Sequence, residues 1–226
     1  MTERKPRAEA RREAAPAAVV ALAVLVGLAV VSWMREWELV GLPWWIWLLL
    51  ALPSLLLAID LLLTLGGAGR VRSRRAALTL LGFLVAGNFA ALALLLTALV
   101  TASTATLGGG ELLLTGFAIW TTNVIVFGLL FWELEAGGPV ARTLVPERRT
   151  PDFQYPQDEN PQLAPPGWSP QVWDYLYVSL TNSIAFSPTD AMPLSLRAKT
   201  AMALESVVSA GTVLLVAARA VNVLGN

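Results

Sequence analysis

The stretch that decides the fold is Asp174–Leu194, which reads Asp-Tyr-Leu-Tyr-Val-Ser-Leu-Thr-Asn-Ser-Ile-Ala-Phe-Ser-Pro-Thr-Asp-Ala-Met-Pro-Leu. It combines a short amphipathic helix, a turn of small polar residues and a proline, and a long apolar helix follows it to about Asn222. This order is typical of a re-entrant segment, which enters a membrane and leaves it on the same side. Irregular backbone is tolerated at membrane depth only where protein buries it or water bathes it. We therefore expect residues 172–226 to carry the function.

The composition predicts an all-α membrane protein. Of the 226 residues, 56% are hydrophobic and only 14% are charged, whereas soluble domains carry about 25% charged residues. The chain has no Cys and no His, and its formal net charge is zero. The commonest catalytic base is therefore missing, and no basic field points to nucleic acid. We expect no enzyme, no cofactor and no metal, but a multi-pass protein of the cell membrane, with a bacterial inner membrane as the expected location.

Five apolar runs are long enough to approach the roughly 20 residues that cross a bilayer. A polar basic head, residues 1–16, precedes them, and residues 17–132 form a four-helix scaffold. Pro53 should bend the second span. Five tryptophans should mark one membrane face, because Trp concentrates at the interface: Trp33, Trp37, Trp44, Trp45 and Trp47. The expected spans are Ala17–Trp33, Leu42–Leu65, Ala76–Thr101, Glu111–Trp132 and Leu196–Asn222.

Charge placement predicts the orientation. Four arginines lie within Gly66–Arg75, and the N-terminus is also basic, so both should face the cytoplasm. Four spans then return the chain to the cytoplasm, and the re-entrant segment would enter from there. In the alternative, Val172–Ser187 crosses fully and gives six spans. We favour five spans plus a half-helix.

The segment Glu133–Gln171 is rich in proline and acidic residues. Its aromatic residues Phe153, Tyr155 and Trp168 suggest a lid that packs over the entrance to the re-entrant segment. The alternative is a plain connector, which is the commoner use of such a segment.

The C-terminal quarter of the chain resembles the pore module of two-transmembrane potassium channels. In that family a pore helix leads to a Thr-Val-Gly-Tyr-Gly filter, then to an Asp, a Pro and the inner helix. Tyr175–Thr181 resembles the pore helix, Ser183–Ser187 lies where the filter would be, and Leu204–Val208 resembles the start of the inner helix. Asp190 and Pro193 resemble the residues after the filter. The whole chain is also similar to bacterial membrane protein families with such a pore-like end.

The filter-like turn departs from the potassium pattern. Ala185 and Ser187 replace both glycines, and glycine reaches backbone angles that other residues adopt only with strain. Phe186 lacks the hydroxyl that would anchor the filter wall. We therefore expect a pore lined by hydroxyls and amides in place of a column of carbonyls. Alternatively, these groups only cap the half-helix. The candidate pore-lining residues are Thr181, Asn182, Ser183, Ile184, Ala185, Phe186, Ser187, Thr189 and Asp190.

Several polar residues of the predicted helices have expected roles. Asp174 should cap its helix, and Asp190 should either lie at the pore mouth or cap the next helix. A carboxylate in a membrane helix is costly unless it is paired or wet, so Glu205 should find polar partners behind the re-entrant turn. Its inner-helix neighbours Ser209 and Thr212 either pack against other helices or line a conduit. Asn88 and Asn123 should form interhelical hydrogen bonds, and Asp60 is a second candidate for a buried acid.

The predicted function is that of a channel-like protein that conducts small ions, favours cations and discriminates poorly between potassium and sodium. The resemblance implies a homotetramer, because one re-entrant loop cannot enclose a pore. Two alternatives remain. The chain is either a non-conducting scaffold or partner-binding subunit with a channel-like fold, or a transporter of small solutes, whose broken helices point at a midplane site.

Overall fold

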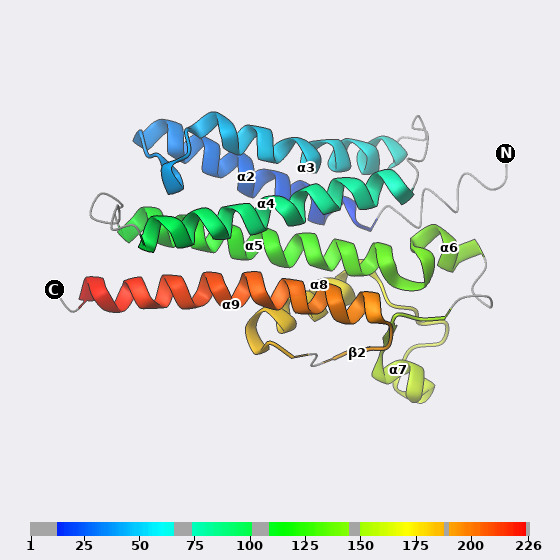
Figure 1. Ribbon diagram of the computed structural model, residues 1–226. Coiled ribbons are helices and arrows are strands. Elements are labelled where there is room, and N and C mark those ends of the chain that lie inside the picture. Colours follow the sequence, from blue (N-terminus) through cyan, green and yellow to red (C-terminus); the bar gives the residue numbers. More distant parts are fainter. Residues whose placement is uncertain (1–12, 66–73, 101–108, 145–149, 188–189, 225–226) are drawn as a thin grey trace.

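The computed structural model describes residues 13–65, 74–100, 109–144, 150–187 and 190–224. Long helices run side by side along the length of the molecule, with the start of α2 toward one end of the bundle and the end of α9 at the other (Figure 1). The long helices are α2 (Ala15–Arg35), α3 (Trp44–Leu65), α4 (Arg74–Val100), α5 (Gly109–Leu134) and α9 (Leu196–Leu224).

In the described part of the chain, four helices are long and apolar enough to cross a membrane, namely α2, α4, α5 and α9. The helix α3 is apolar as well over Trp44–Asp60, and Pro53 lies inside it as expected. Each long helix begins and ends within a few residues of its predicted range. The structure is therefore that of an all-α membrane protein.

The turn between α2 and α3 carries the tryptophan group. The helix α2 ends at Arg35, its C-cap Glu36 has a left-handed φ of 54°, and Ser32 Oγ donates to the carbonyl of Trp37 at 2.5 Å. Trp33 and Trp44 are exposed, as an interfacial role requires. Trp47 is only 1% exposed because its ring packs inside the bundle, and that the turn marks a membrane face stays a prediction.

Short elements lie between α2 and α3 and between α5 and α9. They are η1 (Leu39–Gly41, between α2 and α3), η3 (Glu135–Gly137), α6 (Pro139–Leu144), β1 (Phe153–Gln154), α7 (Pro156–Glu159), η5 (Pro161–Leu163), α8 (Val172–Ala185) and β2 (Met192–Pro193). The strands pair antiparallel, with Phe153 opposite Pro193. This pairing joins the segment before α8 to the segment after it.

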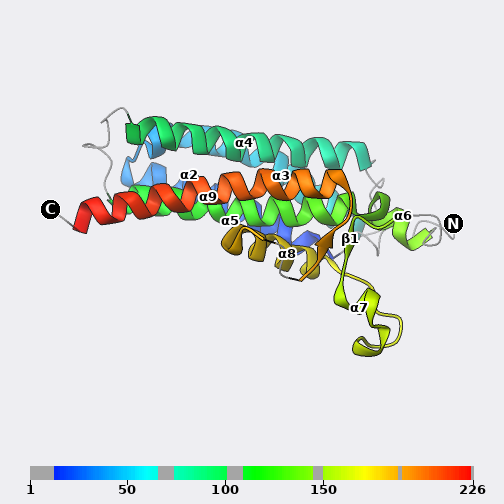
Figure 2. The same cartoon turned by 60° about the horizontal axis from the view of Figure 1, so that its bottom comes forward.

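The helix α8 is a half-helix that packs on α5 and α9 (Figures 1 and 2). Its 14 residues reach about 21 Å, whereas the 29 residues of α9 reach about 43 Å at 1.5 Å per residue. It starts beside the N-terminal end of α2, where the Val172 N–H donates to Glu13 Oε2 at 3.2 Å. The strand β2 brings the chain back to that end, so α8 and the segment after it form a hairpin.

The aromatic residues of the segment before α8 are packed into the protein. Phe153 and Tyr155 are buried, and their rings contact Tyr175 near the start of α8 with centroids 6.2 and 5.9 Å apart. Trp168 contacts Tyr155 at 5.8 Å. Phe153, Tyr155 and Trp168 therefore pack at the start of α8, and that this segment forms a lid over the entrance to a re-entrant segment stays a prediction.

Candidate functional site

The half-helix α8 has a defined cap at each end. At its start Asp174 Oδ2 accepts a hydrogen bond from the Gln171 N–H at 2.7 Å, as the third helical residue of a capping box. The capping role expected of Asp174 is therefore confirmed. At its end Phe186 adopts a left-handed φ of 53°, and its N–H donates to the Asn182 carbonyl at 3.0 Å. A bulky residue in this region is unusual, because glycine is the ordinary choice.

A buried carboxylate lies behind α8. Glu205 of α9 is 0% exposed and is bonded by two side chains of α8. The Ser179 hydroxyl lies within reach of Glu205 Oε1 and, at 2.7 Å, of the Val124 carbonyl, and it can donate to one at a time. The Asn182 amide donates to Glu205 Oε2 at 2.7 Å. The prediction that polar groups behind the turn would bind Glu205 is confirmed.

The polar network continues from α9 through α5 to α4. Asn123 Nδ2 donates to Ser209 Oγ at 2.9 Å and to the Glu205 carbonyl at 3.1 Å. Asn88 Nδ2 lies 3.5 Å from Asn123 Oδ1, and the Thr122 hydroxyl lies 3.1 Å from Asn88 Oδ1 and 2.7 Å from the Ala118 carbonyl and can donate to one at a time. The interhelical role predicted for Asn88 and Asn123 is confirmed. Four helices thus share one buried chain of polar groups.

Not all predicted pore-lining residues lie at the surface. Asn182 and Ser183 are 2% and 0% exposed, because they share the face of α8 that packs against α9. Asn182 Nδ2 also donates to the Met202 carbonyl at 3.0 Å, and Ser183 Oγ donates to the Leu180 carbonyl at 2.8 Å. The prediction that these two side chains line a pore is wrong for this chain, since both are used inside it.

The inner-helix residues are also interior. Glu205, Ser209 and Thr212 are 0%, 0% and 1% exposed. Thr212 Oγ1 donates to the Val208 carbonyl at 2.8 Å, within its own helix. Of the two roles weighed for Ser209 and Thr212, packing agrees with the structure and lining a conduit does not.

The remaining turn residues do reach the surface. Thr181 is partly exposed, Ala185 and Ser187 are exposed, and Ile184 and Phe186 are 62% and 50% exposed. Thr189 lies outside the described residues. The exposed part of the predicted site is therefore the end of α8 and the turn that follows it.

Asp190 is half-buried on the way back to β2. Burial, together with the nearby carboxylate of Asp174, raises the pKa of Asp190. The cap of α9 is Ser195, whose Oγ accepts from the Ala198 N–H at 3.2 Å. Ser195 therefore caps α9. Capping of the next helix was one of the two roles expected of Asp190, and Asp190 does not have it.

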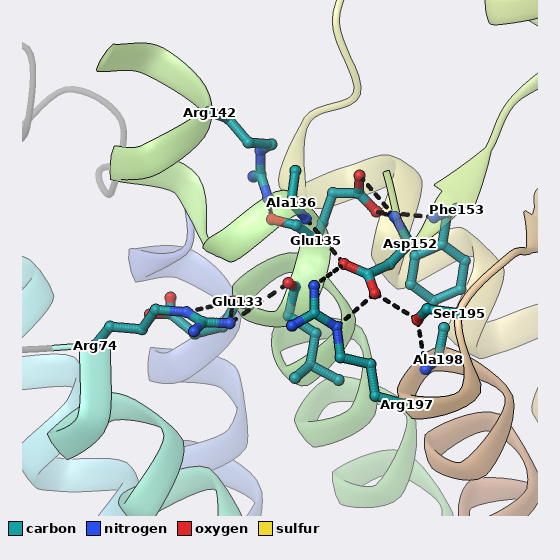
Figure 3. A network of polar contacts seen from close by, with 11 residues as sticks. Arg74, Glu133, Glu135, Ala136, Arg142, Asp152, Phe153, Ser195, Arg197 and Ala198 are labelled. Carbon is teal, nitrogen blue, oxygen red and sulfur yellow. Dashed lines mark hydrogen bonds and ion pairs between the residues drawn. The ribbon is translucent and has the colours of Figure 1, made fainter. Parts of the chain in front are cut away.

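A second polar cluster, which we call the latch, fixes the start of α9 to the end of α5 (Figure 3). Asp152 is 1% exposed, and Arg197 donates to its carboxylate through Nε at 2.5 Å and through Nη2 at 2.6 Å. The Ser195 hydroxyl and the Ala136 N–H, the latter at 3.0 Å, also bind Asp152. One carboxylate thus joins the segments before β1, before α9 and after α5.

Other side chains extend the latch around the end of α5 (Figure 3). The carboxylate of Glu135 accepts from the Asp152 N–H at 3.2 Å and from the Phe153 N–H at 3.0 Å. Arg142 Nη1 donates to the Trp132 carbonyl at 2.7 Å, and Arg74 Nη2 donates to the Glu133 carbonyl at 3.1 Å. These bonds satisfy carbonyls at the end of α5 that have no helical partner.

The charge state of the latch follows from its contacts. Burial raises the pKa of Asp152, but the bonds from Arg197, Ser195 and the Ala136 N–H outweigh burial and hold that pKa below its ordinary value. Asp152 is therefore ionised at neutral pH. The sequence does not reveal this pair, because Asp152 and Arg197 lie 45 residues apart and no spacing rule links them.

Within the described residues, no three His, Cys, Asp or Glu side chains gather as a metal site would require. No protein-family model matches the chain, and neither the curated proteins nor the solved structures give a match. The function therefore has to be inferred from the geometry of α8, its turn and the polar groups behind it.

Proposed function

We propose that this chain is a channel-like, multi-pass protein of the cell membrane, in bacteria the inner membrane, that conducts small ions as a homo-oligomer. In this proposal α2, α3, α4, α5 and α9 span the bilayer, and α8 enters and leaves it on one side as a re-entrant half-helix. The network behind α8 holds the half-helix in place, and the exposed turn at Ile184–Ser187 faces the conduction path.

One observation carries the proposal, namely that the turn is exposed and lies deep along α9. Asn182 contacts Met202 and Glu205, which lie roughly 10–14 Å from the start of α9 at 1.5 Å per residue. Phe186 is one helical turn further along α8. With the start of α9 at the membrane surface, the proposal puts the turn roughly 15–20 Å deep, near the middle of a hydrocarbon core of about 30 Å.

Non-helical backbone at that depth needs cover. In lipid, N–H and C=O groups of irregular backbone that lose water as a partner cost several kcal/mol each. The chain alone leaves Phe186 and Ser187 exposed. Other copies of the chain, together with the water of a central pore, would supply the cover that a single copy lacks.

The exposed surface of α8, from its start to the turn, and of α9 suits contact between copies. It carries large apolar side chains from both α8 and α9, each at least half exposed: Trp173, Tyr177, Ile184, Phe186 and Val207. Aromatic residues are enriched at protein interfaces. The number of copies, four, rests on the resemblance to potassium channels alone.

The first expected result is oligomerisation. Purified in several mild detergents, the chain should have the mass of four copies of 24.2 kDa each after correction for bound detergent. Light scattering with refractive-index detection measures this mass. Val207→Glu should dissociate the oligomer, because it places a charge in the contact. The matched change Glu159→Gln, in the exposed segment before α8, should not. A monomer in every mild detergent would count against the proposal.

The second expected result concerns the choice of ion. Liposomes that contain the protein should pass both potassium and sodium, with a preference below about a hundredfold, or about 2.7 kcal/mol. Strong discrimination needs several stacked rings of carbonyls. The described turn has one left-handed residue, Phe186, and no glycine. Reversal potentials under bi-ionic conditions measure the permeability ratio of potassium to sodium. A potassium preference above about a hundredfold would show that the turn does form a carbonyl filter.

A second candidate function is transport of a small solute. The observation that favours it is Glu205, a buried acid beside the end of a broken helix, which is a feature of transporter sites. A transporter would show saturable, substrate-specific uptake in place of channel-like flux. A scaffold or partner-binding subunit would show neither.

A further inference from the structure

A cavity of about 170 Å³ lies between α2, α3, α4 and α5, apart from α8 and its turn. Its wall combines apolar side chains with four polar residues: Trp47, Ser54, Asn88 and Thr122. No charged side chain lines it. The site proposed for conduction does not use this space.

The sequence explains why the space is there. Pro53 lines the cavity from inside α3, where proline has no N–H to give the Leu49 carbonyl and its ring crowds the preceding turn. Across the gap α4 and α5 present small residues, Gly87, Ala91 and Ala118. A Cβ at Gly87 would come within 3.5 Å of Leu50 Cδ2, so even one methyl group would narrow the gap.

Two polar groups of the cavity wall lack partners. Trp47 Nε1 and Ser54 Oγ are buried and have no hydrogen-bond partner among the described residues. Both residues are nearly inaccessible, at 1% and 0% exposure. Most buried polar atoms have a partner, so each exception calls for an explanation such as a bound molecule. Asn88 and Thr122 differ, since they bond to each other at 3.1 Å.

The cavity reaches the outer surface of the bundle. Leu49 and Phe83 belong to its wall, yet 54% and 64% of their surface is exposed. In a membrane this side of α3 and α4 faces the acyl chains. A molecule that enters there must therefore be soluble in lipid.

We propose that this cavity binds a small neutral amphiphile, with an apolar body the size of one aromatic ring and a single hydroxyl-type polar group, which enters from the bilayer. A dry cavity of about 150 Å³ holds one benzene molecule, so the volume fits such a body. The Trp47 N–H is a donor, and the Ser54 hydroxyl can donate or accept. The polar group of the ligand partners them, and the ring fills the space beside Pro53.

The test uses the purified full chain in detergent with 4-fluorobenzyl alcohol as the probe and 4-fluorotoluene as its matched apolar analogue. Fluorine NMR separates saturable binding from partition into the micelle. The alcohol should bind saturably and more tightly than the toluene. Ser54→Ala should weaken binding of the alcohol by about threefold to tenfold, the worth of one hydrogen bond, and should leave the toluene unchanged.

Cavity-filling variants complete the test. Ala118→Leu should lower the affinity for both probes at least about tenfold, and Gly87→Leu replaces it if the first variant does not fold. The proposal is overturned if the filled variants bind both probes as the native chain does, because the probes then lie elsewhere. It is also overturned if neither probe binds saturably, because the cavity then holds only water. Either outcome leaves the proposed ion conduction untouched.

Discussion

Asp152→Ala is expected to lower the free energy of unfolding by about 3 kcal/mol, because it removes the centre of the latch. The change deletes the acceptor of Arg197, Ser195 and the Ala136 N–H. Loss of one partner of a buried, hydrogen-bonded ion pair costs about 3–5 kcal/mol, and the lower end applies because the Arg197 side chain is 48% exposed. Denaturation of the purified protein in detergent, followed by circular dichroism, measures the loss.

The matched control is Glu159→Ala, which removes an exposed carboxylate from the same segment. Exposed substitutions of this kind change stability by no more than about 0.5 kcal/mol. If both variants lose the same free energy of unfolding, the bonds that Asp152 makes in the latch do not stabilise the fold more than an exposed carboxylate does.

Acidification gives a second readout of the latch. The pKa of Asp152 is lowered on folding, so its contribution is fully present above the ordinary aspartate value of 3.8 and is lost as the pH falls through the lowered value. Asp152→Asn should therefore flatten the acid limb of the stability curve. If the acid limb is unchanged in Asp152→Asn, the loss of stability at low pH comes from other carboxylates.

Gly128→Ala is expected to cost about 2 kcal/mol, because α5 and α8 meet at this glycine. A Cβ there would lie 2.9 Å from the Leu176 Cα, and backbone cannot move aside as a flexible side chain can. The strain should push α8 away from α5 and weaken the bond between Ser179 and the Val124 carbonyl. Thermal unfolding in detergent measures the cost, and ion flux in liposomes should fall with it.

Gly82→Ala is the control for helix propensity. It lies in α4 with nothing within 4 Å of the added Cβ, so Ala should stabilise the helix by up to about 1 kcal/mol. Opposite signs for the two variants are therefore expected. Stabilisation by Gly128→Ala would mean that α8 does not pack as closely on α5 as the structure has it.

The long helices could be predicted from the sequence because lengths and composition alone define apolar spans. The partners of Glu205 were also predictable, since a carboxylate in a membrane helix requires polar neighbours. The inward direction of Asn182 and Ser183 was missed. Their spacing from Ser179 puts all three on one face of α8, and that helical periodicity contradicts a pore-lining role for the two.

The latch could not be predicted, because it depends on how the segment between α5 and α8 folds. Asp152 and Arg197 come within bonding distance only when β1 pairs with β2. The cavity beside Pro53 could not be predicted from the sequence either. The proline predicted a bend, but the space follows from small residues on helices whose packing no spacing rule gives.

The most direct test of the proposed pore uses a single cysteine at Ser187, since the native chain has none. Ser187→Cys and the control Glu159→Cys are both exposed and should both react with a charged thiosulfonate reagent, which mass spectrometry verifies. In liposomes, the reaction at position 187 should lower cation flux at least about tenfold, because a charged group would then lie in the conduction path; the reaction at position 159 should not. Undiminished flux through a fully labelled Ser187→Cys protein would contradict the proposal that the turn after α8 lines the pore.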